Sequence, residues 1–304
     1  LTVAASANVA TALPMSIKGV LTVNGVLTTT STVDVDGATT LAASGTMNLG
    51  AAMHTFGGST TFTGILNATG TFVYDGFVAA NVTAVVTNTL PHVVIAQAGG
   101  AQLNLNTNGL RLTTLTLNSG EAVVGGATVV VLGDAAFNGG ALSGPANFNL
   151  SPDFSVTVLD VAGDVEFNGA ACINAPNINC AGDWTAHPSF DPIQGRVTFD
   201  GVGNHSLIGA NAKFFSLTVN PNYSLTVPTN LELANNLTVG GVFGTTGAMT
   251  IGGDVSVVAG VLSPGPATHF IGGDFTSNGV VQPTGALVFN GATNASLNIP
   301  TTAP

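Results

Sequence analysis

Short runs in which apolar residues alternate with polar ones recur along the whole chain, and glycine or asparagine separates them. Residues 19–29 read GVLTVNGVLTT, two such runs around an Asn-Gly turn. A period of two with many β-branched residues indicates β-strands. No stretch combines a helical period of apolar residues with capping residues at its ends. The pattern therefore predicts an all-β fold.

Three short phrases repeat along the chain. An aromatic residue followed by Asn or Asp and then Gly begins at Tyr74, Phe137, Phe167, Phe199 and Phe289. Leu-Thr-Val begins at residues 1, 21, 217, 225 and 237. A Gly-Asp step places carboxylates at Asp134, Asp164, Asp183, Asp254 and Asp274, spaced by 30, 19, 71 and 20 residues. A short period of this kind is typical of a coil that stacks on itself.

The repeats predict a right-handed parallel β-solenoid (β-helix) with Gly, Asn and Asp corners and rungs of about 20 residues. We expect one continuous solenoid over residues 1–304, with a loop insertion at 171–181 and longer irregular repeats beginning near 70, 195 and 285. The alternative is about three β-sandwich domains, in which each Asn-Gly forms a hairpin turn.

Charge is scarce in this chain. Only 6% of residues are charged, with 4 Lys or Arg against 15 Asp or Glu, and the net charge is -11. The mean hydropathy of +0.48 argues against disorder. No apolar run reaches the length of a membrane-spanning helix, and no cluster of cations favours nucleic acid or anionic lipid. Like charges stacked in ladders would repel one another, so a stacked coil accounts for much of the deficit.

The two cysteines, Cys172 and Cys180, flank an Asn- and Pro-rich segment. Their spacing predicts a disulfide that closes a small loop, which fits an extracellular or periplasmic setting. The alternative is a pair of thiols buried as small apolar residues.

Few residues suggest catalysis. Asp34 and Asp36 are two apart, so they project from one face of a strand and are candidates for an acid and base pair. The alternative is a surface strand that ends in an Asp-Gly turn. The five histidines share no motif, so no catalytic triad is proposed. We expect no enzyme activity.

The repeated Gly-Asp carboxylates Asp134, Asp164, Asp183, Asp254 and Asp274 are weak candidates for calcium ligands, since calcium prefers carboxylate and carbonyl oxygens. The alternative is that each side chain bonds to the backbone of its own turn. We expect no other cofactor or metal. Threonine-rich faces raise an ice-binding alternative, but pairs such as Thr60-Thr61 and Thr113-Thr114 are scattered.

Three segments, VTFDGVGNHSL at 197–207, FSLTV at 215–219 and IGGDFTSNG at 271–279, resemble the repeats of large secreted bacterial β-helix proteins. The resemblance implies an extracellular or cell-surface parallel β-helix with a structural or adhesive role. The phrases are simple, so they are specific for architecture and weak for activity.

The repeat phase is nearly cyclic. Within the chain, Leu217 follows Phe199 by 18 residues, and joining residue 304 of one copy to residue 1 of the next places Leu1 16 residues after Phe289. Neither end shows a charged capping repeat, which solenoids normally need. We therefore expect identical subunits, or adjoining copies of this module, to stack head to tail into a filament or matrix fibre. The expected interface residues are Leu1, Thr2, Val3, Leu297, Ile299 and Pro304.

The alternative function is a surface adhesin or a glycan-binding or glycan-cleaving β-helix, with surface glycans as partners. Nucleic-acid binding and membrane insertion are not expected.

Overall fold

The computed structural model describes residues 1–105, 107–125, 128–144, 158–209, 211–291 and 295–298, and the regular structure in these ranges is β-strand throughout. The strands pair in parallel with the strand about one rung away, as in Thr2↔Thr22 and Leu217↔Leu237. The predicted parallel β-solenoid with rungs of about 20 residues is confirmed. The β-sandwich alternative is wrong, because a sandwich pairs antiparallel strands. Among the residues that the structure describes, no helix is long and apolar enough to span a membrane.

The chain divides into two compact units, Leu1–Asp160 and Val161–Pro304. One continuous solenoid over residues 1–304 stays a prediction. Strand β21 (Val158–Val161) contains the residues at which the units meet in sequence. Each unit is described by itself.

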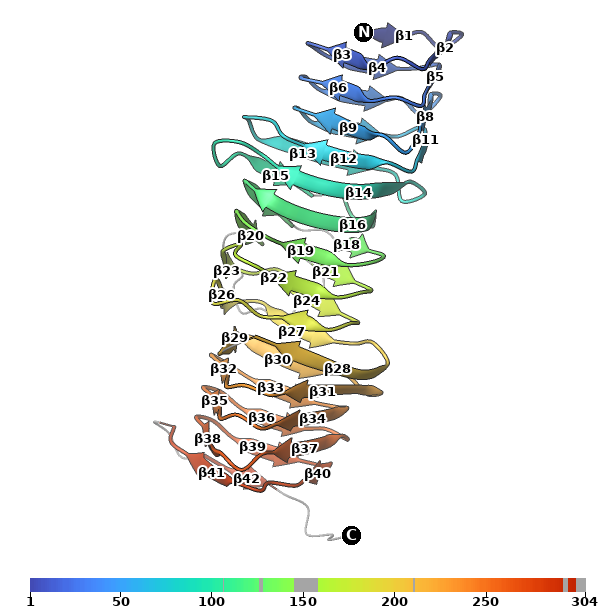
Figure 1. Cartoon of the computed structure of the whole chain (residues 1–304). Coiled ribbons are helices and arrows are strands. Elements are labelled where there is room, and N and C mark those ends of the chain that lie inside the picture. The colour runs from blue at the N-terminus through green and yellow to red at the C-terminus, as the bar shows by residue number, and fades with distance from the viewer. Residues whose placement is uncertain (106, 126–127, 145–157, 210, 292–294, 299–304) are drawn as a thin grey trace. The chain divides into compact units, whose positions relative to one another are not determined.

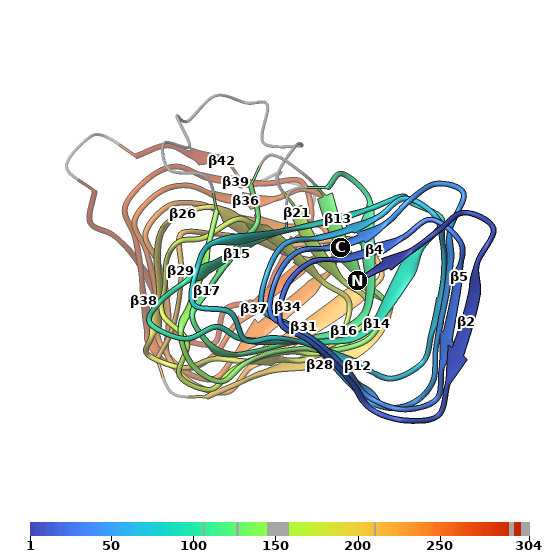
Figure 2. The same cartoon turned by 90° about the horizontal axis from the view of Figure 1, so that it is seen from above.

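The first unit is a stack of rungs with three sides (Figures 1 and 2). Seen along the stack, β2 and β5 form one side, β4 and β13 a second, and β12 and β14 a third (Figure 2). The first side comprises β2 (Asn8–Thr11), β5 (Val26–Thr29), β8 (Thr46–Leu49) and β11 (Ile65–Ala68). The second comprises β1 (Thr2–Val3), β4 (Leu21–Val23), β7 (Thr39–Leu41), β10 (Thr60–Phe62), β13 (Ala80–Ala84), β15 (Gln102–Asn104), β17 (Glu121–Val123) and β20 (Ala141–Ser143). The third comprises β3 (Met15–Ile17), β6 (Val33–Val35), β9 (Met53–Phe56), β12 (Thr71–Tyr74), β14 (Thr89–Ala96), β16 (Leu110–Ser119), β18 (Thr128–Val131) and β19 (Ala135–Phe137).

The second unit contains three columns of parallel strands. One comprises β22 (Val165–Phe167), β25 (Trp184–Thr185), β28 (Gly203–Ile208), β31 (Tyr223–Val227), β34 (Val242–Thr245), β37 (Val261–Pro264) and β40 (Val280–Val281). Another comprises β24 (Asn177–Cys180), β27 (Arg196–Phe199), β30 (Ser216–Val219), β33 (Leu237–Val239), β36 (Val255–Val257), β39 (Phe275–Ser277) and β42 (Leu297–Asn298). The third comprises β23 (Cys172–Asn174), β26 (Phe190–Gln194), β29 (Ala212–Phe214), β32 (Leu231–Leu233), β35 (Met249–Ile251), β38 (Thr268–Ile271) and β41 (Ala286–Phe289).

Each rung buries its alternate residues and stacks them on their counterparts. Leu217 lies against Leu237, and both are buried in the core. The residues that alternate with the buried ones along each strand face outward, because successive side chains of a strand point to opposite faces. Outward residues of the same kind also stack on one another from rung to rung. One outward column in the first unit is Thr2, Thr22, Thr40, Thr61 and Thr83. A second column, in the second unit, is Thr218, Thr238, Ser256 and Thr276, and the buried Thr198 precedes it.

The segment 171–181 is not the loop insertion that we expected from its composition. It contains β23 and β24, which pair in parallel with β26 and β27. Ile178 and Cys180 alternate with Asn179 and are fully buried. The burial of these two side chains explains why an Asn- and Pro-rich segment forms a regular part of a rung.

Candidate functional site

Three carboxylates line one pocket of the first unit. Asp34 lies in the middle of β6, Asp36 directly follows that strand, and Asp75 directly follows β12. Together with the exposed Phe77 and Val78 they line a cavity of about 400 Å³. The structure therefore keeps the predicted pair of Asp34 and Asp36 and adds a third carboxylate to it.

The charges in this pocket are only partly balanced. The Lys18 ammonium lies 3.3 Å from a carboxylate oxygen of Asp36, and the Ser16 hydroxyl donates to Asp34 at 3.3 Å. Desolvation, followed by repulsion from Asp34, raises the pKa of Asp75 above its usual value. Lys18 and Asp36 are both largely exposed, so their ion pair adds little stability.

Asp75 was missed at the sequence level, although the repeat carries a signal for it. Val35 pairs with Phe56, and Phe56 pairs with Tyr74. The residues that follow these three, Asp36, Gly57 and Asp75, therefore occupy the same corner in successive rungs. An alignment of rungs by their buried residues, rather than by their phrases, would have found Asp75.

The repeated Gly-Asp carboxylates each precede a strand directly, and their contacts link neighbouring rungs. In the second unit, the Asp164 carboxylate accepts the backbone N–H of Asp183 at 2.7 Å, and Asp254 accepts that of Asp274 at 2.8 Å. Asp183 and Asp274 accept the N–H groups of Ser206 and Ser296 in the same way. These bonds reach the backbone of the following rung rather than that of the same turn.

The described residues contain no group of three or more His, Cys, Asp or Glu side chains arranged to hold a metal ion. Calcium binding by Asp134, Asp164, Asp183, Asp254 or Asp274 therefore stays a prediction. What these corners do in the structure is bridge rungs through an acceptor oxygen.

Replacing Asp254 with alanine is expected to destabilise the second unit by about 1 kcal/mol, because the Asp274 N–H loses its acceptor. Asp254→Asn is the matched control and should cost less than half as much. The preceding rung already uses an amide here, since Asn236 Oδ1 accepts the N–H of Asp254 at 2.8 Å. Urea unfolding measures both variants. Equal losses would show that the negative charge matters, as in a cation site, rather than the acceptor oxygen.

The expected disulfide is absent, because Cys172 and Cys180 are both free, buried thiols. Cys172 belongs to β23 and Cys180 to β24, and each packs in the core. Burial raises the pKa of the Cys180 thiol to about 12 and also raises that of Cys172. Thiols held protonated in this way are poor nucleophiles, so they act here as small apolar core residues.

The histidines lie at separate positions. His54 and His269 are fully buried, in the first and second unit respectively. His269 Nδ1 accepts the backbone N–H of Met249 at 3.2 Å, which leaves Nε2 to donate to the carbonyl of Gly265 at 3.1 Å. His205 stacks on Tyr223 and lies 3.4 Å from Asp183. These contacts stabilise corners and strands.

The expected interface residues differ in what they offer to another copy. Leu1 and Leu297 are exposed, whereas the side chain of Val3 is buried in the core of the first unit. The Leu1 and Val3 carbonyls accept hydrogen bonds from Thr22 and Asn24. Since the N–H and C=O of one strand residue point to the same edge, the backbone groups of Thr2 face the other way. Ile299 and Pro304 lie outside the described residues.

No protein-family model matches the chain, and comparisons with curated proteins and with solved structures give no match either. The fold itself defines the class, which is that of parallel β-solenoid repeat proteins.

Proposed function

We propose that the chain is an extracellular structural protein that extends head to tail into a β-solenoid filament or matrix fibre. The observation that supports this proposal is that apolar side chains of the core are more exposed in the end rungs than in the rungs next to them. At the first rung, Val9 is 36% exposed, while its partner Leu27 in the next rung is 0% exposed.

In the last described rung, too, apolar side chains are more exposed than their partners in the rung before. Leu297 is 61% exposed and its partner Phe275 is 0% exposed, and Phe289 is 37% exposed where its partner Ile271 is 1% exposed. Among the described residues, β1 and β42 each pair along one edge only, with β4 and β39. An open edge beside uncovered apolar residues is a template for a further strand.

Addition of the first rung of one copy to the last rung of another is a heterologous contact that does not close, and such contacts generate filaments. Either separate subunits add in this way, or adjoining copies belong to one longer chain. The extracellular, bacterial-type location rests on the resemblance of the repeats. The free cysteines give it no support. The role is mechanical, without catalysis and with adhesion second.

Electron microscopy and fibre diffraction of the purified chain test the proposal. We expect filaments with a meridional reflection at about 4.8 Å, the spacing of neighbouring strands. A ladder that resists detergent in gel electrophoresis indicates covalent arrays, and a single band indicates stacked subunits. Short, monodisperse particles at all concentrations would contradict the filament.

Phe289→Asp places a charge on the uncovered end of the core and should abolish filaments. Val202→Asp is the matched control, because Val202 is an exposed apolar residue between β27 and β28, away from the end rungs. Circular dichroism confirms that both variants remain folded. Filaments that form equally well from Phe289→Asp would show that this end does not take part.

A further inference from the structure

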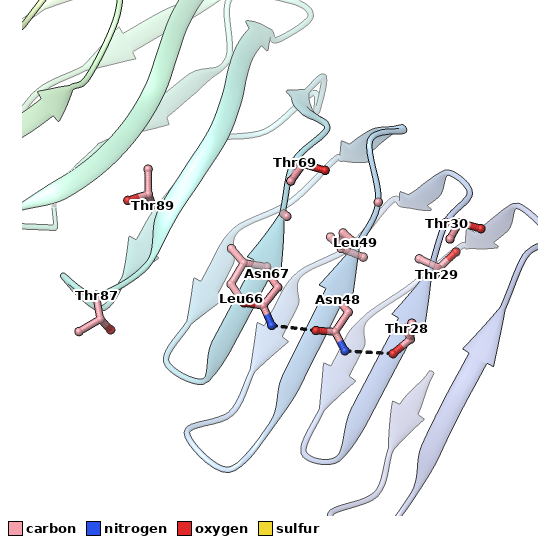
Figure 3. Close-up of a pocket in the computed structure, with 12 residues that line it drawn as sticks. Thr28, Thr29, Thr30, Asn48, Leu49, Leu66, Asn67, Thr69, Thr87 and Thr89 are labelled. Carbon is pink, nitrogen blue, oxygen red and sulfur yellow. Dashed lines mark hydrogen bonds between the residues drawn. The ribbon is translucent and has the colours of Figure 1, made fainter.

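A groove of about 610 Å³ runs along one corner of the first unit (Figure 3). Residues at the ends of β5, β8 and β11 form one wall of the groove. Thr87, just before β14, and Thr89, at its start, form the opposite wall. The polar lining residues that are exposed or half-buried are Thr28, Thr30, Asn48, Asn67, Thr69, Thr87 and Thr89. None of the groove's lining residues is charged.

The groove exists because one side of the solenoid stops at β11. Strand β13 ends at Ala84 and β14 begins at Thr89, so the intervening residues turn directly from one strand to the other without adding a strand to β11. Asn88 lies at the start of the edge that β11 leaves open and also bonds to the corner between β10 and β11. Its Oδ1 accepts the N–H of Leu66 at 3.4 Å, and its Nδ2 donates to the carbonyls of Phe62 and Gly64 at 3.2 and 2.8 Å.

A ladder of neutral polar groups crosses the rungs at the groove. Asn67 Nδ2 donates to Asn48 Oδ1 at 2.8 Å, and Asn48 Nδ2 donates to the Thr28 hydroxyl at 3.0 Å (Figure 3). Each amide carries two N–H donors and a hydroxyl can both donate and accept. Within the described ranges, the ladder uses one donor of each amide, so a second N–H on each and the Thr28 O–H remain for a ligand.

We propose that this groove binds a neutral oligosaccharide. A sugar presents hydroxyl groups that donate and accept, which match amides and hydroxyls repeated from rung to rung. An anionic or cationic ligand would find no counter-charge in the lining. An extended peptide added to β11 would have to displace the Asn88 side chain from the N–H of Leu66, the one of its three bonded backbone groups that lies in β11. The groove is independent of the filament, because its residues lie on the side of the stack.

Titration of the full chain with neutral cello-, xylo-, malto- and manno-oligosaccharides tests the assignment, with binding followed by calorimetry or NMR. We expect one of the four series to bind in the millimolar range. Asn67→Trp fills the groove from an exposed position and should weaken binding at least tenfold. Asn118→Trp is the matched control, since exposed Asn118 forms a similar amide ladder with Asn138 at 3.0 Å outside the groove.

Thr28→Val provides a second, nearly isosteric variant that does not depend on bulk, and it should weaken binding several-fold by removing the hydroxyl. Melting temperatures confirm that all variants are folded. The assignment is overturned if no oligosaccharide binds, if Asn67→Trp binds as tightly as the parent chain, or if an uncharged extended peptide binds the groove and the sugars do not. Loss of filaments with intact sugar binding would affect only the structural proposal.

Discussion

Replacing Phe190 with alanine is expected to lower the free energy of unfolding of the second unit by about 3–5 kcal/mol. Phe190 is buried at the centre of an aromatic cluster, with its ring centroid 4.5 Å from Phe167, 5.2 Å from Trp184 and 5.7 Å from Phe214. Its removal leaves a cavity that stacked rungs cannot easily close, because parallel pairing holds their spacing. Trp184 is the only tryptophan of the chain, so its fluorescence reports unfolding of this cluster.

Ile193→Ala is the matched control for this prediction. Ile193 lies on the same strand as Phe190, β26, but its side chain is exposed. Surface substitutions of this kind usually change stability by less than about 0.5 kcal/mol. Urea denaturation followed at Trp184 compares the two variants. Similar losses in both would show that the strand itself, rather than the aromatic cluster, limits stability.

Replacing Gly260 with alanine is expected to destabilise the second unit by at least about 2 kcal/mol. Gly260 is buried at a corner, where a Cβ would overlap the backbone carbonyl oxygen of Gly241 in the preceding rung. Hydrogen bonds fix the spacing of the rungs here, since the N–H of Val261 donates to Gly241 and that of Val280 donates to Gly260. An added methyl group at Gly260 therefore distorts the corner or lengthens these hydrogen bonds between rungs.

Gly244→Ala is the control for the corner. Gly244 lies within β34, and a Cβ there would meet only the carbonyl oxygen of Ser263, at 4.0 Å. Its φ is not positive, so alanine fits and should leave stability unchanged or raise it by up to about 1 kcal/mol. Thermal melting of both variants measures the contrast. An unchanged melting temperature for Gly260→Ala would contradict the prediction, because it would mean that neighbouring rungs can move apart with little loss of stability.

The scarcity of charge has a structural basis in the outward columns. Thr22 lies between Thr2 and Thr40, and further threonines continue the same column. Stacked threonines pack and solvate well at strand spacing, whereas stacked carboxylates would repel one another. Where carboxylates do repeat, as at Asp254 and Asp274, they follow Gly corners and accept backbone N–H groups of the next rung. The side-chain charge is thereby partly compensated by hydrogen bonds.

The columns also bear on the ice-binding alternative. The threonines of the first unit form an aligned column, which the scattered Thr-Thr pairs in the sequence did not suggest. Each of these strands is short and presents a single outward threonine, which from β4 to β13 lies between two buried residues, as Thr22 lies between Leu21 and Val23. A flat face with two parallel threonine rows is therefore not formed by these strands.

Alternation and repeated phrases were sufficient to predict the parallel solenoid and the length of its rungs. The phrase that begins at Leu217 recurs at Leu237, and the two pair residue for residue. This works because a strand of period two buries the same phrase residues in every rung. The chemistry of the corners was less predictable. Cys172 and Cys180 are core thiols because their strands turn them inward, although the residues between them resemble a loop.

Only the tertiary structure decided which residues from different rungs meet. The offset between paired residues is 20 from Leu217 to Leu237 and 18 from Leu237 to Val255, so distance along the chain does not give the column. For this reason the sequence did not indicate that Asp75 lies beside Asp34 and Asp36 in one pocket. It also did not indicate the groove that forms where no strand follows β11 and Asn88 bonds to the corner instead. Local alternation determines which way a side chain points, while the length of every corner determines what it faces.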